Sequence, residues 1–250
     1  MHIGHASISE NKDNGRNGKA KAGDQTGKEV CIRSFYAKPW VYLIRCKDHN
    51  KAEIMAKACE SICNNPCVGY DQSQRLTLHN ELSRVGFDYN KLTVPCECDC
   101  SSLMTVCAEC AGIMIPYTGG NAPVTANMVK QFDKTGQFEI ITEGINDECN
   151  LKRGDILVGA PNTHTVMVLD DGIPLHLKKR RTLKKGMSGS DVVYMQRILL
   201  KLNYDLGKWG CDGHFGAQTE KAVVQFQKDH CLQPDGIVGI KTWTVLEQYV

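Results

Sequence analysis

The sequence lacks the features that would place it in a membrane or on a polyanion. No run of residues approaches the roughly 18 apolar residues that a membrane-spanning helix needs. Residues 1–18 also lack the apolar core of a signal peptide, so we expect a protein made in the cytoplasm without such a signal and without membrane insertion. The formal net charge is only +2, which argues against nucleic-acid binding through overall charge.

Cysteine, by contrast, is abundant. The 250 residues include 13 cysteines, ten of them from Cys31 to Cys110. An odd number cannot all pair, and a disulfide scaffold normally belongs to a short secreted chain. We therefore expect mostly reduced thiols, several of them packed as small apolar residues.

Apolar periodicity predicts helices and strands in the first part of the chain. The predicted elements are one or two strands in 30–42, helices at 52–63 and 100–111, and an antiparallel pair of strands at 156–158 and 165–169. Asp99 can cap the second helix with its side chain. Helices followed by strands argue for an α+β domain.

A basic stretch divides the chain. Residues 178–185 hold six basic residues in eight and have no apolar face, which is typical of a solvated linker. We therefore expect one domain at residues 1–177 and a second at residues 186–250. A contact with an anionic polymer is the alternative role of this stretch.

The second domain contains a short internal repeat. Asp212-Gly213 and Asp235-Gly236 lie 23 residues apart, and Thr219 and Thr242 follow them at the same offset. Each Gly-containing turn opens a helix. With a further helix at the start of the segment, three short helices form a small all-α bundle.

The repeat resembles the three-helix peptidoglycan-binding domain. The resemblance covers residues 183–249 and depends on Gly186, Gly189, Val192, Gln196, Leu199, the two Asp-Gly turns, Ala222-Val223, Phe226-Gln227, Thr242-Trp243 and Leu246. These residues are also the core and turns of a small bundle. The resemblance therefore specifies a fold, and it implies bacterial peptidoglycan as the partner.

Cys100 and His164 are the candidate catalytic pair. Cys100 begins the predicted helix at 100–111, where unused N–H groups and the helix dipole stabilise a thiolate and should lower the pKa of the thiol. A cysteine nucleophile also needs a base, and His164 stands at the start of the strand at 165–169. Cys107 and Cys110, farther along the same helix, are expected in its packed face.

The surrounding motifs resemble the NlpC-type branch of papain-like cell-wall cysteine peptidases. They are Asp99-Cys100-Ser101-Ser102 on a helix, Arg153-Gly154-Asp155 before a strand, and His164 at the start of the next strand. The resemblance spans about residues 52–170. It implies helices packed on a small antiparallel sheet, a Cys nucleophile that attacks a peptidoglycan amide, and a His that carries the proton. Residues 23–30 also resemble the N-termini of phage and prophage endolysins.

The same resemblance implies further site residues. Tyr70 matches an aromatic residue that lies over the cleft of the family. Asp99 either pairs with an amine of the stem peptide or only caps its helix. The family usually has a third polar residue that orients the histidine, and here His176 and His5 are the two candidates.

These patterns together predict an endolysin-like peptidoglycan hydrolase that acts as a monomer at the cell wall after release and needs no cofactor. The expected reaction is endopeptidase cleavage between D-glutamate and the diamino acid. The alternatives are an N-acetylmuramoyl-L-alanine amidase with the same Cys-His pair and a non-catalytic wall-binding protein.

A metal or redox role for the cysteines is a further alternative. Cys96, Cys98 and Cys100 alternate in sequence, and Cys63 and Cys67 lie upstream. Alternation along an extended strand gives no turn between ligands, unlike the paired Cys-x₂₋₄-Cys spacing of structural zinc sites. We therefore expect no metal at this site.

Overall fold

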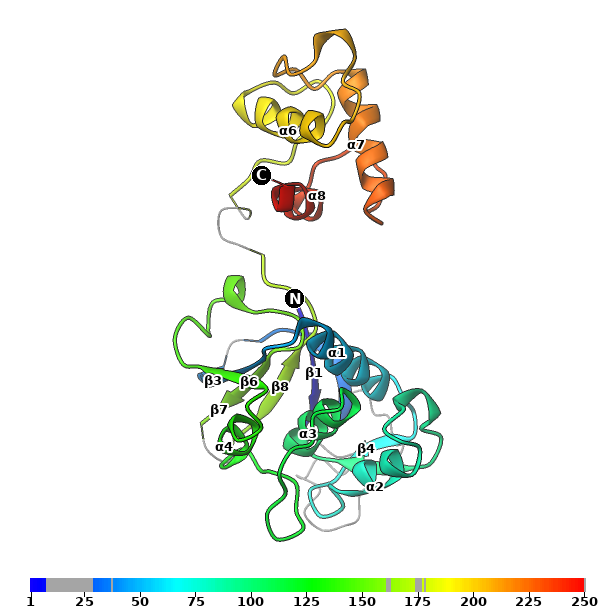
Figure 1. The fold of residues 1–250 in the computed structure, drawn as a ribbon, viewed down its shortest axis with the longest axis vertical. Coiled ribbons are helices and arrows are strands. Elements are labelled where there is room, and N and C mark those ends of the chain that lie inside the picture. Colours follow the sequence, from blue (N-terminus) through cyan, green and yellow to red (C-terminus); the bar gives the residue numbers. More distant parts are fainter. Residues whose placement is uncertain (8–28, 37, 161–162, 174–176, 178, 250) are drawn as a thin grey trace. The chain divides into compact units, whose positions relative to one another are not determined.

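The chain forms two compact units, Met1–Gly172 and Ile173–Val250 (Figure 1). The computed structural model describes residues 1–7, 29–36, 38–160, 163–173, 177 and 179–249. The first unit combines a sheet with helices, and the second is helical. The α+β fold class with a C-terminal helical region is therefore confirmed.

A six-stranded antiparallel sheet forms the middle of the first unit. In spatial order its strands are β2 (Val30–Ser34), β1 (His2–Ala6), β8 (Thr165–Val168), β7 (Ile156–Gly159), β3 (Trp40–Cys46) and β6 (Phe138–Ile141). β7 and β8 pair as predicted, and both are buried along their whole length because their side chains alternate between two apolar clusters, one containing Ile156 and Met167 and the other Leu157 and Val166. β1 lies between β2 and β8, so the N-terminal residues complete the sheet.

The packing of β1 requires a glycine. Gly4 pairs with Met167 of β8, and its open side faces a helix. A Cβ atom at this position would lie 2.3 Å from the Sγ of Cys59 and 3.3 Å from the Sγ of Cys63. Any larger residue would push that helix away from the strand.

Helices cover one face of this sheet (Figure 1). The helices of this unit are α1 (His49–Cys63), α2 (Thr77–Arg84), α3 (Cys100–Cys110) and α4 (Met128–Asp133). The predicted face of α1, formed by Met55, Cys59 and Ile62, is buried as expected. Two short parallel strands, β4 (Val68–Tyr70) and β5 (Cys96–Cys98), lead toward α2 and α3.

The second unit contains the three expected helices. They are α6 (Ser190–Lys201), α7 (Ala217–Asp229) and α8 (Ile240–Leu246). Short 3₁₀ turns of both units lie at Tyr89–Lys91, Glu148–Asn150, Gly207–Trp209 and Glu247–Tyr249.

Two buried glutamines explain the internal repeat. Nε2 of Gln227 donates to Asp235 Oδ1 (2.9 Å), Ile237 O (2.9 Å) and Thr242 Oγ1 (3.2 Å), and Oε1 accepts from Gly236 N (2.9 Å). Gln196 makes the equivalent bonds to the turn at 212–214 and to Thr219. Each glutamine therefore joins one helix to an Asp-Gly turn and to the threonine of the next helix.

The described residues of the basic stretch at 178–185 belong to the second unit, and several of them pack on its helices. Leu183 is fully buried in the core of that unit and pairs with Val238. Arg180 forms an ion pair with Glu247, and the guanidinium of Arg180 stacks over the rings of Tyr194 and Trp243. Part of the expected linker therefore belongs to the packing of the second unit, because its leucine and the arginine stem cover apolar surface.

Among the described residues, no helix has the length and apolar character needed to span a bilayer.

Candidate functional site

Cys100 is the first residue of α3. The Asp99 side chain accepts hydrogen bonds from Ser101 N (3.0 Å) and Ser102 N (2.7 Å), and Ser102 Oγ accepts from Asp99 N (2.8 Å). This reciprocal capping box fixes where the helix begins and confirms Asp99 as its cap. The thiol is therefore held at a defined helix N-terminus, with only 9% of the residue exposed.

His164 directly precedes β8, beside the start of α3. Its backbone carbonyl accepts from Gly159 N (2.9 Å), which closes the β7–β8 hairpin. The backbone N–H of the next residue, Thr165, hydrogen-bonds toward the Cys100 thiol, which lowers the pKa of the thiol. The fold thus places Cys100 next to the residue that follows His164, although the two predicted catalytic positions are 64 residues apart in sequence.

The expected lowering of the Cys100 pKa is wrong. Burial raises the pKa of this thiol to about 12, and the negative charge of Asp99 raises it further. The N–H groups of Thr165 and Ser101 and the charge of Arg75 act in the opposite direction but do not overcome burial. A helix terminus stabilises a thiolate only when desolvation is smaller than the gain from the dipole.

The histidine is also held in its neutral form. Burial lowers the pKa of His164 to about 3, and the charges of His5, Lys38 and Arg33 act in the same direction. Its Nε2 atom is buried and has no hydrogen-bond partner in the part of the chain that the structure describes. Both the Cys100 thiol and the His164 imidazole are therefore in their neutral forms near pH 7.

His5 is the orienting candidate that can be placed. It lies on β1, is buried, and its ring meets that of His164 edge to face with centroids 5.7 Å apart. Burial, and then the charge of Arg33, lower the pKa of His5 to about 4. Neither ring nitrogen of His5 has a hydrogen-bond partner among the described residues. The contact with His164 is therefore one of packing. The other candidate, His176, lies outside the described residues.

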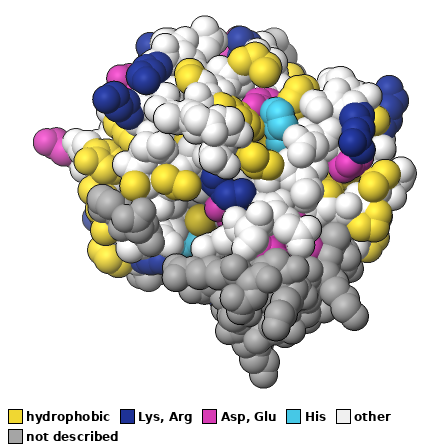
Figure 2. Space-filling model, turned by 90° about the horizontal axis from the view of Figure 1, so that it is seen from below, with side chains coloured by type: hydrophobic (Ala, Val, Ile, Leu, Met, Phe, Trp, Pro, Cys, Tyr) yellow, Lys and Arg dark blue, Asp and Glu magenta, His cyan; other side chains and the backbone are white. Residues whose placement is uncertain are grey.

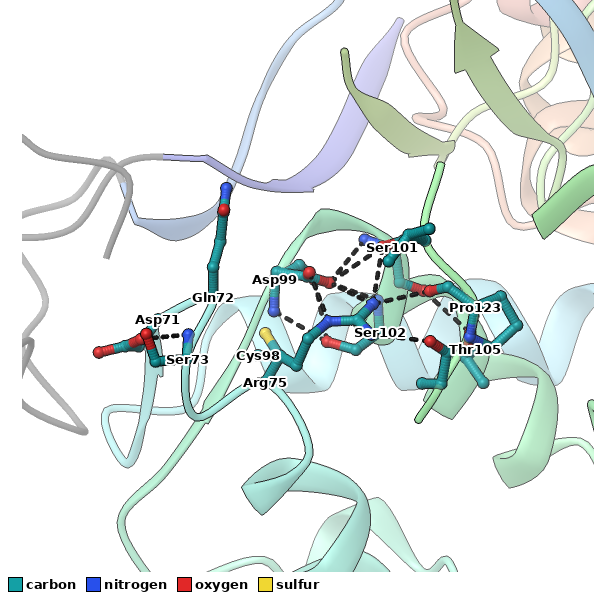
Figure 3. A network of polar contacts seen from close by, with 12 residues as sticks. Asp71, Gln72, Ser73, Arg75, Cys98, Asp99, Ser101, Ser102, Thr105 and Pro123 are labelled. Atoms are coloured by element: carbon teal, nitrogen blue, oxygen red, sulfur yellow. Dashed lines mark hydrogen bonds and ion pairs between the residues drawn. The ribbon is translucent and has the colours of Figure 1, made fainter. Parts of the chain in front are cut away.

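Asp99 is engaged on both carboxylate oxygens (Figure 3). Besides capping α3, it accepts from Arg75 Nε at Oδ2 (2.6 Å) and from Arg75 Nη2 at Oδ1 (3.1 Å). Both side chains are about nine-tenths buried. Sequence reasoning missed Arg75, which lies 24 residues before Asp99 in a segment without a distinctive motif.

Tyr70 is the last residue of β4, which pairs with β5, the strand directly before α3. The ring is buried, and its hydroxyl accepts from Gln72 Nε2 (2.9 Å). Burial raises the pKa of this phenol, and a thiolate at Cys100 would raise it further. Tyr70 therefore lies near the thiol as a neutral hydroxyl.

The Gly154-Asp155 motif has a structural role. Asp155 is 1% exposed and accepts from Arg45 Nε (2.8 Å) and Nη2 (2.6 Å), which joins β7 to β3. Burial nevertheless raises the pKa of this carboxyl above its usual value. Gly154 has a φ of +88°, and a Cβ atom there would lie 2.6 Å from the carbonyl oxygen of Ala52.

The cysteines do not form a metal site in the described parts of the chain. No three His, Cys, Asp or Glu side chains there are grouped so as to hold an ion. All 13 cysteines are described, and all are free thiols in this structure. Cys107 is packed in the core, as predicted for this helix, whereas Cys110 is half-buried.

The described part of the face shown in Figure 2 has no large patch of charges of one sign. On the face shown in Figure 2, basic and acidic side chains are interspersed among apolar ones in the described part. This agrees with the net charge of +2. Such a face gives no long-range attraction for a polyanion.

Comparison with known proteins identifies both parts of the chain. The family model described as "Endolysin-like domain" matches residues 3–174, and the model described as "Putative peptidoglycan binding domain" matches residues 188–246. The N-acetylmuramoyl-L-alanine amidase CwlL of Bacillus licheniformis is 25% identical over 237 residues, covering 86% of this chain and 65% of the relative.

Two further relatives match over shorter stretches. A protein of Bacillus licheniformis named "Probable N-acetylmuramoyl-L-alanine amidase" is 47% identical over 60 residues, 24% of this chain and 17% of its own length. The crystal structure of a Burkholderia AP3 phage endolysin is 41% identical, covers 27% of this chain and 25% of that one, and has a TM-score of 0.25. The chain thus spans 65% of the length of CwlL and 17% of the length of the second Bacillus licheniformis protein.

Proposed function

The chain belongs to the endolysin-like domain family, and on this premise we propose that it cleaves an amide bond of bacterial peptidoglycan with Cys100 as nucleophile and His164 as base. The observation that carries the proposal is the position of Cys100 next to the residue that follows His164. Cys100 begins a capped helix, and the N–H of Thr165, the first residue of β8, hydrogen-bonds toward the thiol. The sequence motifs around both residues, which resemble those of NlpC-type cysteine peptidases, support the proposal.

We infer general-base catalysis that starts from a neutral thiol and a neutral imidazole. Because the pKa of the thiol is raised and that of the imidazole is lowered, a preformed thiolate–imidazolium pair is disfavoured before substrate binds. Cys100 Sγ attacks the amide carbonyl carbon as its proton passes to the His164 ring. The imidazolium then protonates the leaving amine, and the C–N bond breaks to leave a thioester on Cys100. Water, deprotonated by His164, hydrolyses the thioester and restores the thiol.

The helix start supplies a donor for the oxyanion. Asp99 already caps the N–H groups of Ser101 and Ser102, so the N–H of Cys100 itself is the terminal donor that a tetrahedral intermediate can use. Asp99 is committed to this cap and to Arg75. We therefore assign Asp99 to holding the site and not to an amine of the stem peptide, and Tyr70 to the neighbouring wall.

Two bonds are candidates for cleavage. The first is the bond between D-glutamate and the diamino acid, which the sequence resemblance of the Cys100 and His164 motifs to NlpC-type peptidases suggests; the Cys-His pair itself serves either bond. Cleavage between N-acetylmuramate and L-alanine is the second candidate, because two of the relatives are named as amidases of that bond. The second unit, with its match to a peptidoglycan-binding model, would hold the protein on the cell wall.

The test is mass spectrometry of purified peptidoglycan digested by the full chain. New free amino groups on the diamino acid identify the endopeptidase, and release of intact stem peptides from the glycan identifies the amidase. Cys100→Ala should abolish both kinds of product, whereas Cys110→Ala on the same helix should keep the parent rate. Digestion that survives Cys100→Ala would exclude this residue as the nucleophile. A chain that sediments with walls but releases nothing would be a binding protein.

A further inference from the structure

Arg75 uses its whole guanidinium group at the start of α3. Nε donates to Asp99 Oδ2 (2.6 Å), Nη1 to Ala122 O (2.7 Å), and Nη2 to Asp99 Oδ1 (3.1 Å). Nη2 also donates to Ser101 Oγ (2.9 Å) and to Pro123 O (2.7 Å). One side chain thus joins the helix cap, the residue after Cys100 and the backbone at 122–123 (Figure 3).

The chain places Arg75 by a tight local turn. Asp71 Oδ1 accepts from Ser73 N (2.6 Å) and Gln74 N (3.3 Å), and Asp71 itself is fully buried. This turn directly follows Tyr70, so one short segment supplies both Tyr70 and Arg75 to the region of the thiol. The side chain has little freedom, because only 11% of it is exposed.

The two oxygens of the Asp99 carboxylate have different partners. Backbone N–H groups of the helix bind Oδ1, and Arg75 Nε binds Oδ2, so the cation balances the charge of this buried carboxylate. A carboxylate next to a thiol, however, opposes loss of the thiol proton. A buried cation bound to that carboxylate offsets the effect, and a guanidinium can do so with fixed bidentate geometry.

We propose that Arg75 is a positioning residue for Cys100: it locks the Asp99 cap and the 122–123 segment to the helix start and neutralises the carboxylate beside the thiol. The proposal rests on the proposed function of Cys100. Asp99 and Arg75 act on the Cys100 pKa with opposite sign, as the geometry requires. The pair therefore gives the helix its cap without leaving a net charge that would oppose attack by sulfur.

The test measures the alkylation rate of Cys100 by iodoacetamide in the full chain, from pH 7 to pH 10. Arg75→Gln leaves Asp99 unbalanced, and loss of an opposite charge at this range raises a thiol pKa by about one unit or more. The thiolate fraction falls about tenfold per unit, and the higher nucleophilicity of the more basic thiolate returns about threefold. We expect a net loss of about threefold or more in rate at each pH.

Two matched variants separate charge from structure. Arg75→Lys keeps the charge but loses the fork, so its alkylation rate should stay within about twofold of the parent. The double variant Arg75→Gln with Asp99→Asn removes both charges and keeps a residue able to cap a helix. It should recover most of the rate that Arg75→Gln loses. Alkylation of buried Cys107 reports any general loss of fold in each variant.

Three results would overturn the proposal. One is a folded Arg75→Gln chain with an unchanged Cys100 rate. Another is a double variant no faster than Arg75→Gln. The third is an Arg75→Lys chain as slow as Arg75→Gln. None of these readouts uses hydrolysis, so they are independent of the proposed reaction. If digestion survives Cys100→Ala, the proposed function fails even where the charge effect on the thiol is observed.

Discussion

The buried histidines should make the fold sensitive to mild acid. His5 and His164 are held neutral, with pKa values of about 4 and about 3, whereas an unfolded chain binds protons near pH 6.5. Because the folded state binds fewer protons than the unfolded state, the free energy of unfolding is highest above pH 6.5. It decreases as the pH falls toward the folded pKa values. Lowering the pH from 7 to 5 should cost about 2 kcal/mol for each histidine, or about 4 kcal/mol in all.

The assay is urea unfolding of the full chain at pH 7 and pH 5. This window lies above the range in which most carboxyl groups titrate, so the histidines should dominate the change. His5→Phe keeps a ring against His164 but removes one titrating group, and its loss of stability between the two pH values should be about half that of the parent. His49→Gln, at an exposed position of α1, is the matched control and should leave the pH dependence unchanged.

The reasoning fails if the free energy of unfolding of the parent is the same at both pH values. It also fails for His5 in particular if His5→Phe loses as much stability on acidification as the parent. Either result would mean that protons or water reach these rings in the folded chain.

Three further predictions concern the site and its support. The kcat/KM for peptidoglycan fragments, measured on folded protein, should stay within about threefold from pH 7 to pH 5, since His164 stays neutral; a histidine with a pKa of 6.5 would lose about 25-fold over that range. Gln227→Leu removes four buried hydrogen bonds and should destabilise the second unit by about 3 kcal/mol in calorimetry, whereas Gln225→Leu, at an exposed position of the same helix, should change it by less than about 0.5 kcal/mol. Asp155→Asn breaks the buried pair with Arg45 and should cost the first unit about 3 kcal/mol in urea unfolding, against little change for Asp133→Asn at an exposed position of α4.

Elements with a long apolar period were predictable from the sequence. The helix α1 follows from the helical spacing of its buried residues, and β7 and β8 follow from short continuous apolar runs, since both strands are buried along their whole length. The small strands were not predictable. β1 has only five residues, two of them histidines, and β4 and β5 have three each, so their pairing depends on neighbours that are distant in sequence. α2 buries only Leu78 and Leu82, which is too few positions for a period.

The positions of the proposed catalytic residues could be predicted, but their ionisation could not. A helix start and a following strand locate Cys100 and His164, because capping and alternation are local properties of the chain. The pKa of each group depends on how much water the whole fold removes, and no local pattern contains that quantity. The local argument from the helix dipole therefore had the wrong sign for the thiol of Cys100.

The raised pKa of the Cys100 thiol also affects the proposed mechanism. In the proposed reaction, the raised pKa of the thiol and the lowered pKa of the imidazole disfavour a charge-separated pair at rest, so the charge develops during attack on the carbonyl. Groups that balance charge around Cys100 then act mainly on the transition state. Arg75 is such a group, because it compensates the one carboxylate that the helix cap requires. Asp99 and Arg75 therefore act together. Asp99 caps the helix and so fixes the position of the Cys100 sulfur, and Arg75 compensates the negative charge that Asp99 places beside the sulfur.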